Sequence, residues 1–74
     1  YKSSEPSVEV VQYTDGAENL VFAINHSDKQ VETIISVPRG SSVRQITGDA
    51  KLIAASGNKV TFLMPPKSAV TFIN

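Results

Sequence analysis

The sequence predicts an all-β fold, a small antiparallel β-sandwich of about seven short strands with immunoglobulin-like or Greek-key/meander topology. Turn-forming Gly, Pro, Asn and Asp residues recur at intervals of roughly 8 to 12 residues, as in sandwiches and barrels. The segments between them are rich in β-branched and aromatic residues, which favour strands. No apolar pattern with helical spacing runs beyond about one turn. The turn signals lie at residues 15–16, 25–28, 38–40, 48–49, 56–58 and 65–66.

The expected strands follow in order between these turns, at residues 8–13, 19–25, 30–37, 43–47, 51–55, 59–64 and 68–73. Only the fifth has a helical alternative, because the segment 49–56 contains a run of Ala, Leu and Ile. Gly48 and Gly57 limit such a helix to about two turns, so we interpret this segment as a strand. The polar residues 25–28 are interpreted as a hairpin connection, since Asn, Ser and Asp side chains bond nearby backbone groups.

Length and composition fit one folded domain. The chain has 74 residues, of which 41% are hydrophobic and 19% charged, unlike a disordered segment. A chain this short buries only about 60% of its unfolded surface, so its stability is expected to be modest. We assign residues 1–7 to a linker or N-terminal extension and residues 8–74 to a single β-sandwich domain. The first residues contain neither an initiator Met nor an apolar signal core, which suggests a segment of a longer protein.

Period-two alternation predicts which side chains enter the core. The expected core rows are Leu20, Phe22 and Ile24; Val31, Thr33, Ile35 and Val37; Val60, Phe62 and Met64; and Val70 and Phe72. The second strand is unusual because Val21 and Ala23, on its opposite face, are also apolar. It is therefore expected in the middle of a sheet with both faces covered, one of them by another domain. Together with Val11, these two residues form the expected domain-docking face.

Charge and cysteine content exclude several classes of function. Seven Lys and Arg balance seven Asp and Glu, and no basic stripe is present to neutralise phosphates, so nucleic acid is not an expected partner. No apolar run approaches the roughly 20 residues that span a bilayer, and no basic amphipathic helix is evident, so no membrane partner is expected. The chain has no Cys, which excludes disulfides and cysteine-based zinc sites.

No catalytic, cofactor-binding or metal-binding residues are predicted. His26 is the only histidine and is interpreted as an exposed loop residue, because no HxH or HExxH spacing accompanies it. The carboxylates lie mostly in turns or on outward strand faces, and no Ser lies in a GxSxG motif. No phosphate-binding loop is present. These 74 residues are therefore not expected to be an enzyme.

Tyr13 is the candidate carbohydrate contact. Sugar-binding modules present aromatic rings, yet the chain has no Trp and its three Phe residues fall in the expected core rows. Tyr13 closes the first strand beside a turn. Its alternative role is a half-buried ring with a solvated hydroxyl.

Three stretches, LVFAINHSDKQV, VRQITGDAKL and VTFLMPPKSAVTFIN, together resemble the C-terminal β-sandwich appended to the catalytic barrel in several glycoside hydrolase families. Family 30 is the most similar, and family 42 β-galactosidases and the α-fucosidase family end in similar domains. The matching residues are Asn25, Ser27, Thr47, Met64, Pro65, Ser68, Val70, Thr71 and Phe72. The chain departs from family 42 at Lys67 and Ser68, where an aromatic residue or glycine is expected after the paired prolines.

The resemblance implies a non-catalytic accessory domain that packs on, and stabilises, the catalytic barrel of a parent glycoside hydrolase. The barrel is then the partner, and it carries the catalytic carboxylates. Secreted, periplasmic or cell-surface location is what the resemblance suggests. The alternative is a carbohydrate-binding or protein-interaction module of a surface or secreted protein, acting through Tyr13 or by strand addition at an open sheet edge.

Overall fold

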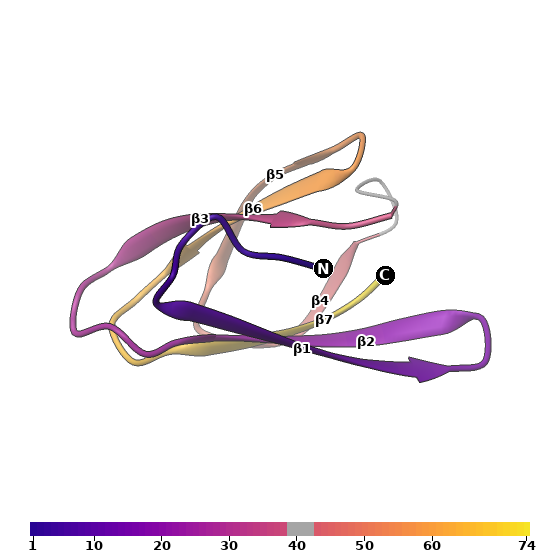
Figure 1. The fold of residues 1–74 in the computed structure, drawn as a ribbon, viewed down its shortest axis with the longest axis horizontal. Helices are drawn as coiled ribbons and strands as arrows, with labels where there is room; N and C mark the ends of the chain where they lie inside the picture. Colours follow the sequence, from indigo (N-terminus) through magenta and orange to yellow (C-terminus); the bar gives the residue numbers. More distant parts are fainter. Residues whose placement is uncertain (39–42) are drawn as a thin grey trace.

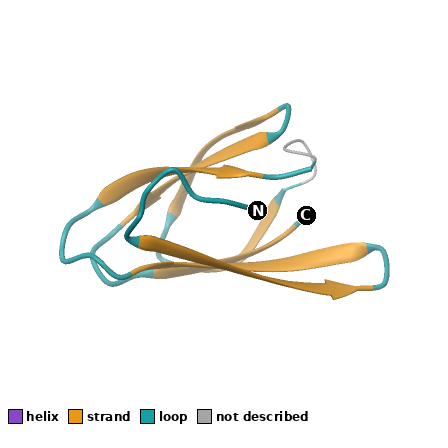
Figure 2. Cartoon of the chain, in the orientation of Figure 1, coloured by secondary structure: helices purple, strands orange, loops and turns teal. Residues whose placement is uncertain are grey.

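The computed structural model, which describes residues 1–38 and 43–74, is an all-β sandwich of two antiparallel sheets. Figure 1 shows the sheets as two layers, and Figure 2 shows strands joined by loops. The strands are β1 (Val8–Asp15), β2 (Glu18–Asn25), β3 (Val31–Ser36), β4 (Arg44–Gly48), β5 (Lys51–Ser56), β6 (Lys59–Met64) and β7 (Ala69–Ile73). The predicted fold class is confirmed, and the doubtful segment 49–56 contains a strand. Part of the turn expected at residues 38–40 lies outside the described residues.

The four-stranded sheet has the order β1-β2-β7-β4 and the three-stranded sheet the order β3-β6-β5. Only the hairpins β1–β2 and β5–β6 join strands that are neighbours in both sequence and sheet. The pairs β2–β7, β3–β6 and β4–β7 are distant in sequence, so the chain crosses repeatedly between the two layers. This connectivity encloses one core between the sheets.

The core consists of apolar side chains from both sheets. Its buried members are Val8, Val21, Ala23, Ile35, Val37, Ala50, Val60, Phe62, Met64, Val70 and Phe72. The rings of Phe62 and Phe72, one from each sheet, lie 5.3 Å apart between centroids. The rows predicted for the third, sixth and seventh strands therefore face inward, and Val31 packs against the core from a partly buried position.

The row predicted for the second strand is wrong. Val21, Ala23 and Asn25 are fully buried, whereas Leu20, Phe22 and Ile24 are partly exposed on the outer face. Because β2 is apolar on both sides, alternation alone cannot select the inward face, and a shift by one residue inverts it. The strand does lie mid-sheet, between β1 and β7, as predicted.

The N-terminal segment, residues 1–7, pairs with the edge of the three-stranded sheet. Ser3 forms a β-bridge with Ile35, and Ser4 N donates to the carbonyl oxygen of Ile34 at 2.8 Å. Ser36 N donates to the carbonyl oxygen of Lys2 at 2.8 Å. The segment thereby covers the outer edge of β3, whose backbone groups would otherwise face solvent.

The two described ends of the chain also meet. The Tyr1 hydroxyl donates to Asn74 Oδ1 at 2.8 Å, and Figure 1 shows both ends beside each other. Asn74 continues the pairing of β7, because its backbone exchanges hydrogen bonds of 2.9 and 3.0 Å with Asn19. Residues from both ends therefore help to close the sandwich.

Candidate functional site

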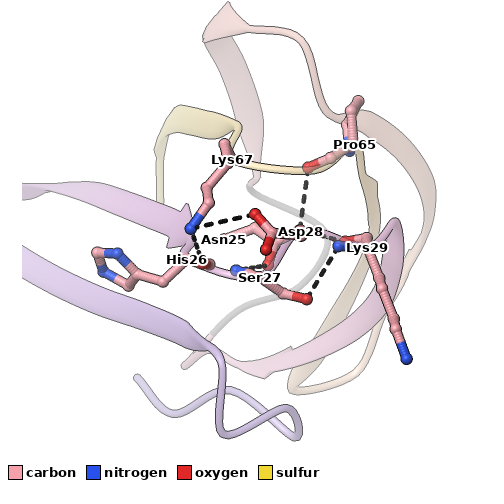
Figure 3. A network of polar contacts seen from close by, with 7 residues as sticks. All are labelled: Asn25, His26, Ser27, Asp28, Lys29, Pro65 and Lys67. Atoms are coloured by element: carbon pink, nitrogen blue, oxygen red, sulfur yellow. Dashed lines mark hydrogen bonds and ion pairs between the residues drawn. The ribbon is translucent and has the colours of Figure 1, made fainter.

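The polar residues that end β2 form the network in Figure 3. Asn25 is fully buried, and its Nδ2 donates to the carbonyl oxygens of Lys29 at 3.0 Å and Pro65 at 2.9 Å. Its Oδ1 accepts from Ser27 N at 2.9 Å, and Ser27 Oγ accepts from Lys29 N at 3.0 Å. These bonds satisfy a buried amide and close the turn, as short polar side chains do in loops.

Lys67 fastens the turn between β6 and β7 to this loop. Its backbone nitrogen donates to the carbonyl oxygen of Ser27 at 3.0 Å, and its Nζ donates to the carbonyl oxygen of His26 at 2.6 Å. The ammonium group lies 3.5 Å from Asp28 Oδ1, in a pair that is largely exposed. The contacts of Asn25 and those of Lys67 both join the loop after β2 to the turn between β6 and β7, so the network has a structural role.

His26 is exposed, as predicted, and its Nε2 lies 2.9 Å from Glu9 Oε1. The two side chains are 59% and 56% exposed, so water screens their interaction and its contribution to stability is small. Within residues 1–38 and 43–74, no three His, Asp or Glu side chains gather where they would hold a metal ion. The pair therefore joins the loop between β2 and β3 to β1.

The second candidate is the outer face of the four-stranded sheet. The strand registers place alternate residues of β1, β2 and β7 on this face, opposite to the core. Its large apolar members, hereafter the outer apolar face, are Val11, Tyr13, Leu20, Phe22, Ile24 and Ile73. The rings of Tyr13 and Phe22 meet edge to face with centroids 5.9 Å apart. Tyr13 is 62% exposed, so most of its ring remains accessible.

Charged residues are absent from the outer side of the two central strands between Leu20 and Ile24 and along β7. They occur at the margins, where Glu9 lies on β1 and Arg44 on β4. The outer side of the three-stranded sheet is mixed, because Glu32, Ser36 and Lys59 lie on it beside the apolar Ile34 and Leu63. Two outer faces of one molecule thus differ in polarity, and a solvated sheet face normally carries polar residues.

The structure brings together only part of the predicted site. Val11 and Tyr13 lie on the outer apolar face, whereas Val21 and Ala23 are buried in the domain's own core and offer no docking surface. Sequence reasoning missed Leu20, Phe22, Ile24 and Ile73. Asn25 was the residue that could have indicated the inward face of β2. It shares a strand face with Val21 and Ala23, and its amide binds carbonyl oxygens inside the domain.

The outer apolar face offers burial of aliphatic and aromatic surface and one phenol hydroxyl. These groups can contact another apolar or aromatic surface. The described residues contain no helix that is long and apolar enough to cross a membrane. No protein-family model matches this chain, and neither a curated protein nor a solved structure matches it.

Proposed function

We propose that this chain is a non-catalytic accessory β-sandwich of a glycoside hydrolase, which packs on and stabilises the catalytic barrel. The observation that supports this proposal best is the outer apolar face, an uncharged surface on the two central strands of the larger sheet. Contiguous exposed apolar surface on a small domain marks a contact with another protein surface. The resemblance of the loop and strand motifs to accessory sandwiches of glycoside hydrolases supports the barrel as the occupant.

The shape of the face suits a barrel. The outside of a β/α barrel is a ring of helices, and helices packed on a sheet are a standard pair of layers. Inter-domain contacts of this kind bury about 600 to 1,500 Å². Covering what remains exposed of Leu20, Phe22 and Ile24, which are already partly buried, contributes about 0.5 kcal/mol for each side chain. The marginal Glu9 and Arg44 then lie at the rim of the contact, where charges remain hydrated.

The test is a Phe22→Lys substitution in the full-length protein that contains this chain. A lysine at this position places an ammonium group in the domain contact, so the melting temperature of the full-length protein should fall by several degrees more than that of the isolated chain, which loses only the ring contact with Tyr13. Thr61→Lys is the matched control, because Thr61 lies on the outer side of the three-stranded sheet. Equal melting temperatures for the two variants would contradict docking through the outer apolar face.

The enzymatic part of the proposal has a separate test. The full-length protein is assayed with a panel of nitrophenyl glycosides, alongside the isolated 74-residue chain. Hydrolysis by the full-length protein alone supports a catalytic barrel with an accessory sandwich. Hydrolysis by the isolated chain, or none by either protein, contradicts the proposal.

Carbohydrate binding by the sandwich itself is the second candidate function, and the exposure of the Tyr13 ring favours it. Oligosaccharides are titrated into the 15N-labelled chain while the amide shifts are followed. Shifts confined to Tyr13 and its β2 neighbours, and lost in Tyr13→Ala, support a sugar contact. An unperturbed spectrum leaves docking as the role of this face.

A further inference from the structure

The four sheet edges are not equally protected. β4 carries a bulge between Gln45 and Thr47, and β5 carries one between Leu52 and Ala54. Residues 2–4 cover β3. Bulges and covering segments are the devices by which proteins prevent edge strands from pairing with other chains. β1 has neither device, since all its eight residues pair with β2 in unbroken register and no described strand lies on its other side.

The hydrogen-bond pattern shows which backbone groups face this open edge. His26 N donates to the carbonyl oxygen of Ser7 at 2.9 Å, so these residues form a hydrogen-bonded pair just before β1 begins. Hydrogen-bonded and non-hydrogen-bonded pairs alternate along an antiparallel ladder. The N–H and C=O groups of Val10, Gln12 and Thr14 therefore point away from β2. They are the donors and acceptors that the open edge offers to a further strand.

The same alternation on the other side of β2 supports this assignment. Asn25 N donates to the carbonyl oxygen of Ser68 at 2.8 Å, and Asn19 N donates to that of Asn74 at 3.0 Å. Odd-numbered residues of β2 therefore bond to β7. The even-numbered residues bond to β1 and, through the register of the pair, to its odd-numbered residues.

We propose that β1 is a self-association edge, which pairs antiparallel with β1 of a second copy about a two-fold axis at Val11. Residues opposite each other in a ladder must share a sheet face. With the axis at Val11, Val10 lies opposite Gln12 of the second copy, and Glu9 lies opposite Tyr13 of the second copy. Each Val10–Gln12 pair exchanges both of its backbone hydrogen bonds, as paired edge strands do.

The length of the paired segment selects this register over its neighbours. With the axis at Val11, Val8 lies opposite Thr14 of the second copy, so the whole of residues 8–14 pairs. An axis at Gln12 would place Val8 opposite Gly16 in the turn, and an axis at Val10 would place Thr14 opposite Pro6, which has no N–H to donate. The axis at Val11 places no two charged residues opposite each other along β1 and puts valine against valine at the centre. A second copy is therefore a self-complementary partner for this edge.

Such a dimer has a geometric consequence. The two four-stranded sheets join into one continuous sheet, because the two-fold axis runs perpendicular to it. Both outer apolar faces then lie on the same side of the joined sheet. Pairing through the edge and docking through the face use different surfaces, so the two proposals stand or fall separately.

The test uses single cysteines in a chain that otherwise has none. In the proposed register the two Val11 residues form a non-hydrogen-bonded pair with Cα atoms about 4.5 Å apart. This separation suits a disulfide, whose Cα atoms lie about 4.4 to 6.8 Å apart. The two Tyr13 residues are displaced by four positions, roughly 13 Å along the strands, and cannot be bridged. Val11→Cys and the more exposed control Tyr13→Cys are oxidised under identical mild conditions.

The expected result is a disulfide-linked dimer that forms on the order of tenfold faster for Val11→Cys than for Tyr13→Cys. Sedimentation of the wild-type chain should show a concentration-dependent dimer. Gln12→Pro should remain monomeric, because proline removes an N–H that points to the open edge and leaves the bonds to β2 intact. Equal cross-linking of the two cysteine variants, or a wild-type chain that stays monomeric at high concentration, would overturn the proposal.

Discussion

The side-chain nitrogen of Asn25 donates to the carbonyl oxygen of Pro65, 40 residues further along the chain, at 2.9 Å. This partly buried bond ties the end of β2 to the turn between β6 and β7, and hence one sheet to the other. It also determines which face of β2 points inward, because the amide would lose its partners on the outer side. A single polar residue thus orients a strand whose apolar residues do not distinguish its two faces.

The first prediction concerns this bond. Asn25→Ala removes the amide bonds to the carbonyl oxygens of Lys29 and Pro65 and to the backbone nitrogen of Ser27, and of these only Pro65 keeps another side-chain donor, Ser68 Oγ at 2.7 Å. The free energy of unfolding should fall by about 2 to 3 kcal/mol. Asn58→Ala is the matched control in the exposed turn between β5 and β6, where the change should stay within about 0.5 kcal/mol. Urea unfolding of both variants checks the order, and equal losses would argue against a special role for Asn25.

The second prediction compares two neighbouring residues of β2. Val21→Lys places an ammonium group in a fully buried position, so the isolated chain should not fold. Phe22→Lys changes the outer face, where the main loss is the ring contact with Tyr13, so the chain should fold with a loss of about 1 kcal/mol. Circular dichroism and thermal melting distinguish the two. If Val21→Lys folded and Phe22→Lys did not, Leu20, Phe22 and Ile24 would be the inward residues of β2, as the sequence alone predicts.

This inversion shows how far the sequence predicts the fold. Strand positions are predictable because turn residues separate them, and the inward rows of β3 and β6 are predictable because Glu32 and Lys59 mark their outer sides. β2 has no such polar mark between Leu20 and Ile24, so its inward face depends on Asn25. The choice follows from a contact with Pro65, which no local pattern contains.

The candidate site shows the same limit. Val11 was expected to share a docking face with Val21 and Ala23, but it lies on the outer face while those two residues are buried in the core. Local sequence patterns also could not predict the order of the strands in the sheets. The β2–β7 and β3–β6 pairs join residues that are distant in sequence. The covering of β3 by the N-terminal segment was also not predictable. Its contacts use serine hydroxyls, and serines are equally common in solvated linkers.

The third prediction concerns the bond between the N-terminal segment and the core. Thr33 is fully buried, and its hydroxyl lies 2.5 Å from Ser3 Oγ. Ser3→Ala removes this partner from a buried hydroxyl and should cost about 1 to 3 kcal/mol. Thr33→Val should cost less, because Ser3 Oγ still accepts from Glu5 N at 3.0 Å. A double-mutant cycle read by urea unfolding checks this, with the double variant expected to be more stable than the Ser3→Ala variant.

The fourth prediction concerns Gly48, which ends β4 with φ at +122°. A Cβ at this position would lie 2.4 Å from the carbonyl oxygen of Ala69 and 2.7 Å from Val70 Cα. Both neighbours are backbone atoms of β7 and cannot rotate away, so β4 must separate from β7. Gly48→Ala should therefore cost about 3 kcal/mol or more, from the clash together with the backbone strain.

Gly57→Ala is the control that separates these two effects. Gly57 also has a positive φ, +59°, but a Cβ there meets nothing within 4 Å. Its cost should be the conformational term alone, about 1 to 2 kcal/mol. Urea unfolding gives both values, and amide hydrogen exchange should show protection lost along β4 only in Gly48→Ala. Equal losses of unfolding free energy for the two variants would contradict this prediction. They would mean that a small shift at the end of β4 relieves the clash while the strand stays paired with β7.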